Sequence, residues 1–220
     1  MIRTDEAIKR DLIDELYWDY RVDASNVKAE VSDGKVTLSG TVPSYSARSA
    51  AVTAAWGIDG VNEVTNLLTV QFPPTFVVPT DAEIKTSADR TLAWNPDVYS
   101  TDIDVTVTGG VVRLEGTVDD YWKRWKAEDL VSNLKGVIDV ENHLTVVPSK
   151  SFLDKDIAKD IEAALERNLY VDAEKVTVEV EDGNVTLTGT LPSYYARSRA
   201  YDAAAFTPGV LKVDNHIVVI

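Results

Sequence analysis

The chain has 220 residues, of which 36 are acidic and 22 basic, giving a formal net charge of −14. An acidic surface opposes general binding of nucleic acids, because that binding depends on Lys and Arg neutralising phosphates. Cysteine is absent, which excludes disulfides and thiolate chemistry.

The first residues lead directly into a charged segment without the apolar stretch of a secretory signal peptide. No apolar run is long enough for a transmembrane helix. As written, the sequence therefore predicts a cytoplasmic chain. A mature chain whose signal peptide had been removed would look the same and would be periplasmic.

Residues 4–20 show the pattern of an amphipathic helix. Ile8, Leu12 and Leu16 recur at a spacing that places them on one helix face. After this helix, Val27, Ala29 and Val31 alternate with polar residues. Such alternation predicts a strand with one buried face.

Asp33-Gly34 marks a two-residue hairpin turn, which requires positive φ. The next strand therefore runs antiparallel to the first. Its inward positions include Leu38 and Gly40, and we interpret Gly40 as leaving room for a helix that passes close to the sheet.

A Pro-Ser-Tyr turn at residues 43–45 then begins a second helix, whose buried face is rich in alanine. The last strand places Val64, Asn66 and Leu68 on its inward face. A buried amide must find hydrogen-bond partners, so we expect Asn66 to pin a neighbouring loop.

The whole pattern occurs three times. The landmarks that recur at the same places are Gly34 and Gly40, Gly110 and Gly116, Gly183 and Gly189, and Asn66, Asn142 and Asn215. We predict an α+β chain of three tandem α-β-β-α-β modules, at residues 1–72, 78–148 and 150–220, each with two helices on one face of a three-stranded sheet. Domains this small bury little surface alone, so extensive contacts between modules are expected.

The hairpin string Asp/Gly-Gly-x-Val-x-Leu-x-Gly-Thr-Val/Leu, the recurring Arg48, Arg124 and Arg197, and the closing Gly-Val-x-x-Val-x-Asn-x-x-x-Val resemble the BON domain over nearly the whole chain. Members of this family often carry two copies and an export signal, whereas three copies occur here. The resemblance implies a non-catalytic binding module of bacterial osmotic-shock-inducible, transport-associated or envelope proteins. It suggests an adaptor that binds a protein partner or phospholipid headgroups.

No set of residues predicts catalysis, a cofactor or a metal. His143 and His216 occupy the same position in different repeats, on the outward face of the last strand, and nothing indicates that they converge. Nucleophile and phosphate-loop motifs are absent. Carboxylates such as Asp156 and Asp160 have the spacing of a solvated helix face. An enzyme with its site between repeats remains a third hypothesis, behind an adaptor and a lipid binder.

One local feature departs from the repeat, and we name it the basic-aromatic segment: Trp122, Lys123, Arg124, Trp125 and Lys126. Helical periodicity turns both tryptophans away from the buried face. The segment could bind anionic headgroups or a protein partner, or it could pack against a flanking repeat. Tyr17, Trp18 and Tyr20 allow the same interpretations.

Overall fold

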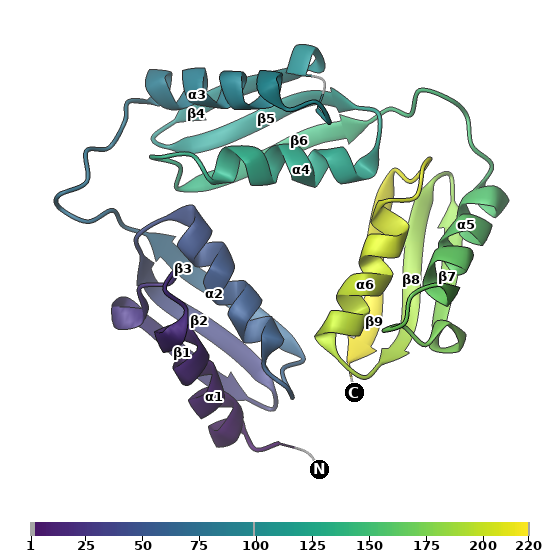
Figure 1. Ribbon diagram of the computed structural model, residues 1–220, viewed down its shortest axis with the longest axis horizontal. Coiled ribbons are helices and arrows are strands. Elements are labelled where there is room, and N and C mark those ends of the chain that lie inside the picture. Colours follow the sequence, from purple (N-terminus) through teal and green to yellow (C-terminus); the bar gives the residue numbers. More distant parts are fainter. Residues whose placement is uncertain (1–2, 99, 220) are drawn as a thin grey trace. The chain divides into compact units, whose positions relative to one another are not determined.

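The computed structural model describes residues 3–98 and 100–219 (Figure 1). Over these residues the chain forms six α-helices and three three-stranded sheets, one sheet in each repeat. The predicted α+β class and the order of elements within each repeat are confirmed.

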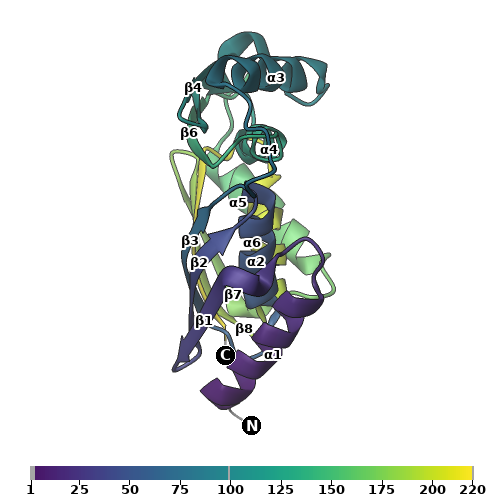
Figure 2. The ribbon, with the colours of Figure 1, turned by 90° about the vertical axis from the view of Figure 1, so that its left-hand side faces the viewer.

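The first repeat shows how these residues build one module. It contains α1 (Asp5–Trp18), a 3₁₀ turn (Ala24–Asn26), β1 (Val27–Ser32), β2 (Lys35–Val42), α2 (Tyr45–Gly57) and β3 (Glu63–Val70). The hydroxyl of Thr4 accepts a hydrogen bond from the backbone N–H of Ala7 and so caps α1. Figure 2 views the sheet of this module nearly edge-on, with α1 and α2 on the same side of it.

The second and third repeats have the same elements. The second contains α3 (Asp81–Trp94), a 3₁₀ turn (Ser100–Asp102), β4 (Ile103–Thr108), β5 (Val111–Val118), α4 (Tyr121–Ser132) and β6 (Asp139–Val146). The third contains α5 (Asp154–Glu166), a 3₁₀ turn (Ala173–Lys175), β7 (Val176–Glu181), β8 (Asn184–Leu191), α6 (Tyr194–Ala205) and β9 (Lys212–Val219).

The sheet order makes the first strand of each module an edge. In the first repeat the order is β1-β2-β3, with β1 antiparallel and β3 parallel to β2. The parallel pair needs a crossover connection, which α2 supplies. Both β1 and β3 therefore have one side that no strand of their own sheet covers.

The core lies between the helices and the sheet. Leu12 of α1 and Leu38 of β2 are fully buried in the first repeat, as are Ile161 of α5 and Leu187 of β8 in the third. The second helix contributes mainly alanines, among them Ala51, whose small side chains let the helix lie close to the sheet. The predicted buried faces are confirmed at these positions.

The hairpin turn is confirmed, but the interpretation of the second glycine is wrong. Asp33 and Gly34 have φ of 53° and 74°, as a type I′ turn requires. Gly40 has φ of 110°, and a Cβ atom there would overlap the carbonyl oxygen of Asn26. The chain that passes close to Gly40 is thus the end of the 3₁₀ turn before β1, and not one of the α-helices that pack on the sheet.

The other two repeats repeat this close approach. Gly116 and Gly189 also have positive φ, and a Cβ atom would overlap the carbonyl oxygens of Asp102 and Lys175. All three modules therefore require glycine at this position for the same reason.

The prediction for the recurring asparagine also needs correction. Asn66 is exposed and Asn142 and Asn215 are only half-buried. In each case the side-chain oxygen accepts a hydrogen bond from a backbone N–H two residues further along the same strand, at 3.0 to 3.2 Å. The asparagine therefore shapes its own strand and does not pin a loop. The side-chain NH2 of Asn142 also donates to the carbonyl oxygen of Arg124 and to the Glu128 carboxylate, at 2.7 and 3.1 Å, which ties β6 to α4.

Candidate binding sites

The basic-aromatic segment forms the first turns of α4, and its central lysine is already paired. Lys123 is 9% exposed, and its Nζ lies 2.7 Å from an Asp119 carboxylate oxygen and 3.5 Å from one of Asp120. Burial disfavours the charged lysine, but these carboxylates outweigh it and raise the Lys123 pKa. Lys123 is a structural cation that holds the preceding turn.

The two tryptophans of the segment pack on the third repeat. Residues 87–106, 113–131 and 141–220 form one compact unit. Within it, the rings of Trp122 and Trp125 lie with their centroids 5.8 and 5.5 Å from that of Phe206. Trp125 keeps 36% of its surface exposed. These contacts correspond to the predicted packing against a flanking repeat.

The recurring arginines have structural partners. The guanidinium groups of Arg124 and Arg197 donate to the carbonyl oxygens of Asn142 and Asn215, at 3.1 and 3.4 Å. In the second and third modules they thereby tie the second helix to the last strand.

Arg48, at the same position in the first repeat, differs. Its guanidinium lies 2.7 Å from the carboxylate of Asp139. Burial opposes the charged form of Arg48, and the Asp139 carboxylate outweighs this and raises the Arg48 pKa.

An exposed aromatic cluster lies at the end of α1. Tyr17, Trp18 and Tyr20 are 73%, 79% and 96% exposed. The rings of Tyr17 and Trp18 meet edge to face, with centroids 5.3 Å apart. The cationic side chain next to this cluster in the sequence is Arg21, and it forms an ion pair with Asp19.

The two histidines lie on separate strands. His143 and His216 are exposed on β6 and β9 of different repeats. Among the described residues, no three His, Cys, Asp or Glu side chains are grouped as a metal site would require. Nor does that part of the chain include a helix with the length and apolar character needed to cross a membrane.

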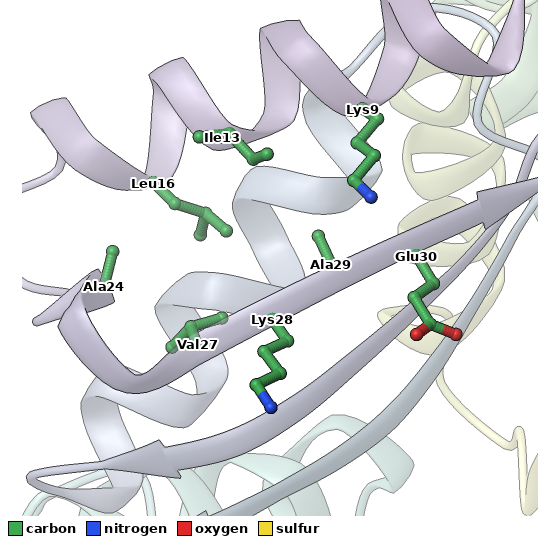
Figure 3. A pocket seen from close by; sticks show the side chains of 8 residues that line it. All are labelled: Lys9, Ile13, Leu16, Ala24, Val27, Lys28, Ala29 and Glu30. Atoms are coloured by element: carbon green, nitrogen blue, oxygen red, sulfur yellow. The ribbon is translucent and has the colours of Figure 1, made fainter.

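A groove of about 360 Å³ lies between α1 and the free edge of β1, and we name it the α1–β1 groove. It is lined by Lys9, Ile13, Leu16, Ala24, Val27, Lys28, Ala29 and Glu30 (Figure 3). Figure 3 shows Lys9, Ile13 and Leu16 descending from α1 towards Ala29, whereas Lys28 and Glu30 point away from the helix. The floor of the groove is apolar, and Lys9 places a positive charge at one end of it.

Sequence analysis missed this groove, although comparison of the repeats contains a signal for it. Where the first repeat has Ala29, the others have the larger Val105 and Val178. Where it has Ile13, they have Asp89 and Glu162. A small residue on the strand and an apolar residue on the helix occur together in the first repeat alone, which is where the groove opens.

A model of the BON domain matches residues 4–71, 80–148 and 153–220. The chain belongs to the BON domain family. The three BON domains coincide with the three folded repeats, so the resemblance noted from the hairpin string is confirmed. The matched family is not named for a catalytic activity.

Two bacterial relatives share part of this BON chain. Osmotically-inducible protein Y of Escherichia coli is 31% identical over 143 residues, covering 62% of this chain and 71% of that protein. Outer membrane lipoprotein DolP of Haemophilus influenzae is 33% identical over 112 residues, covering 50% of this chain and 58% of that protein, which is less than two thirds of its length. CdsD of the Chlamydia trachomatis type III secretion system aligns over 97% of this chain and 92% of its own, with 14% identity and a TM-score of 0.26, too low to support an argument.

Proposed function

We propose that this chain is a non-catalytic adaptor of bacterial osmotic or envelope stress, which acts by binding a partner protein through a BON domain. One observation carries the proposal: an open apolar groove lies beside an unpaired strand edge in the first BON domain. The names of the two relatives, one osmotically inducible and one an outer membrane lipoprotein, support the physiological setting.

The same relatives bear on location. One of them is named for the outer membrane, and neither supports the expectation of a cytoplasmic chain. We therefore place the proposed function at the cell envelope. Fractionation of the source cells, with antibody detection of the chain, tests this placement directly.

The proposed function is tested by deleting the gene and shifting the cells to high osmolarity. We expect slower recovery of growth, restored by the wild-type chain. A His143→Ala/His216→Ala chain should restore growth equally, because neither side chain has a chemical role here. Normal recovery of the deletion strain would contradict the stress function, and failure of the double variant would contradict a non-catalytic one.

A second candidate function is binding of anionic phospholipid through the basic-aromatic segment. The specific observation in its favour is the 36% exposure of Trp125, next to Lys126 on α4. An aromatic ring beside a cation suits the interface of an anionic bilayer. Against it, Lys123 is held by Asp119 and Asp120, which leaves less positive charge for headgroups.

Sedimentation with phosphatidylglycerol vesicles tests this second candidate. Trp125→Ser introduces the residue that the first and third repeats have at this position, Ser49 and Ser198. We expect it to lower vesicle retention severalfold. Trp94→Ser is the matched control, since it removes an exposed tryptophan of the same repeat from outside the segment. Retention that is absent in the wild type or unchanged in Trp125→Ser would rule out this function.

A further inference from the structure

We propose that the α1–β1 groove binds an extended peptide segment of a partner protein, which adds to the sheet as a strand beside β1. The peptide would alternate apolar and polar residues and carry an Asp or Glu near Lys9. This inference rests on the proposed function as a partner-binding protein and names the chemistry of the partner.

The backbone of β1 is available on one side. In a two-residue hairpin, the residues flanking the turn form a hydrogen-bonded pair, here Ser32 and Lys35. Hydrogen bonding in an antiparallel ladder alternates, so the N–H and C=O groups of Ala29 and Val31 and the C=O of Val27 point away from β2. The N–H of Val27 already donates to the carbonyl oxygen of Ala24. A peptide strand would satisfy the groups that point away from β2, as in other cases of strand addition.

The floor of the groove suits every second side chain of such a strand. Successive residues of a strand point to opposite faces, so alternate peptide residues would face α1. There they would meet Ile13, which is 48% exposed, and the buried Leu16 and Ala29. Covering Ile13 removes exposed apolar surface from water and favours binding.

Charge at the rim indicates the polar residue that the peptide should carry. Lys9 extends from α1 into the groove (Figure 3). Within the described part of the chain, neither Lys9 nor Lys28 forms an ion pair. An Asp or Glu of the peptide placed beside Lys9 would form an ion pair with its ammonium group. On the other face of the sheet, Lys28 and Glu30 lie side by side and suit polar peptide residues of either sign.

A peptide fits this place better than a lipid does. An acyl chain could cover Ile13, but it would leave the outward N–H and C=O groups of β1 without water or partner. Main-chain hydrogen bonds from a peptide avoid that cost. A second copy of this chain could also offer a strand, and the experiment below separates that case.

The other repeats provide the variants that close the groove. Ala29→Val introduces the residue found at Val105 and Val178, and Ile13→Glu introduces the one found at Glu162. Lys9→Glu reverses the charge of an exposed side chain and leaves the core untouched. Leu67→His is the matched control, because His143 and His216 occupy this position in the other repeats, on the opposite edge strand.

The test uses the full chain and a library of acetylated eight-residue peptides that alternate Val, Ile, Leu or Phe with Asp, Glu, Ser, Thr or Lys. Peptides enriched on the wild-type chain should carry an acidic residue at a preferred position. We expect Ala29→Val, Ile13→Glu and Lys9→Glu each to weaken peptide binding at least about tenfold, which corresponds to about 1.4 kcal/mol. Binding by Leu67→His should match the wild type. Circular dichroism melting identifies any variant that fails to fold. If Ala29→Val or Ile13→Glu does not fold, the binding measured for Lys9→Glu tests the inference, because this substitution leaves the core unchanged.

Hydrogen exchange identifies the binding mode. Bound peptide should slow exchange at the amides of Ala29 and Val31. The inference would be overturned if the wild-type chain enriched no peptides beyond those enriched on Ile13→Glu. It would also be overturned if Ala29→Val and Lys9→Glu bound the peptides as tightly as the wild type, or if the bound peptide protected amides elsewhere and not those of β1. Sedimentation velocity showing that the free chain is a dimer dissociated by Ile13→Glu would also overturn it, because the occupant would then be a second copy.

Failure of this inference can be told apart from failure of the proposed function. If Ile13→Glu restores growth of the deletion strain at high osmolarity, the groove is dispensable while the stress function stands. If the deletion strain grows normally but peptides bind as expected, the stress function fails while the groove stands.

Discussion

At the scale of single residues, the glycine of the second strand is the strictest requirement of the module. Gly40, Gly116 and Gly189 all combine positive φ with a carbonyl oxygen in the space that a Cβ atom would occupy. Both features penalise any other residue, the first by backbone strain and the second by steric overlap.

Gly189→Ala should therefore destabilise the third domain by about 2 kcal/mol or more, since strain of this kind costs on the order of 1–3 kcal/mol before the overlap is relieved. Gly57→Ala is the control. It lies at the end of α2, where a Cβ atom meets nothing within 4 Å, so a gain of about 0.5–1 kcal/mol is expected. Urea unfolding measures both. Equal stability of Gly189→Ala and the wild type would show that the turn before β7 can move freely.

At the scale of elements, one aspartate ties the first helix of each module to its hairpin. The carboxylate of Asp154, at the start of α5, accepts hydrogen bonds from the backbone N–H groups of Asp182 and Gly183 at 2.8 and 2.9 Å. Asp5 and Asp81 make the same pair of bonds in the other repeats. A carboxylate that accepts two backbone bonds is a strong tie between elements distant in sequence.

Asp154→Ala should lower the free energy of unfolding by about 1–3 kcal/mol, because it leaves two turn N–H groups without their acceptor. Asp156→Ala removes an exposed acid from the same first turn of α5 and should cost only the smaller helix-dipole contribution. Chemical denaturation compares the two. A similar loss for both variants would mean that the tie contributes nothing beyond charge at the helix start.

The start of α3 is pH-sensitive. The Glu83 carboxylate accepts hydrogen bonds from the backbone N–H and hydroxyl of Thr80, both at 2.8 Å, in a capping box. The backbone bond, followed by the hydroxyl bond, lowers the pKa of Glu83 from its ordinary 4.5. A lowered folded-state pKa adds stability that is present above pH 4.5 and is lost as the pH falls through the folded value.

Glu83→Gln should accordingly be less stable than the wild type at pH 7, and the difference should shrink as the pH falls below 4.5. Thermal unfolding from pH 7 to pH 3 measures it. Glu166→Gln, at the end of α5, makes the same chemical change outside a capping box and serves as the control. A difference that is independent of pH would locate the effect of Glu83 outside the capping box.

At the scale of the whole molecule, the third repeat closes its own core. Its buried cluster, which includes Ile161, Leu187 and Ile217, is drawn from residues of that repeat, with Tyr121 of α4 packed at the margin. Burial, followed by the hydrogen bond between the Tyr201 and Tyr121 hydroxyls, raises the pKa of Tyr201.

A fragment of residues 150–220 should therefore fold in one cooperative transition, and the pKa of Tyr201 should fall towards its ordinary value once Tyr121 is gone. Circular dichroism melting and spectrophotometric titration of tyrosine measure the two effects. An unfolded fragment would mean that the third domain depends on its neighbour for stability. An unchanged Tyr201 pKa would mean that burial within the third repeat is its whole cause.

The sequence by itself determined the number of modules, their elements and their hairpin turns. These features depend on local rules: apolar spacing along α1, alternation along β1, and the positive φ that Asp33-Gly34 supplies. The tertiary structure alone decided the parallel pairing of β2 with β3, the reason for Gly40, the tie through Asp154 and the α1–β1 groove. Each of these depends on atoms far apart in the chain being brought together, and a spacing pattern carries no information about which backbone or cavity a side chain will meet.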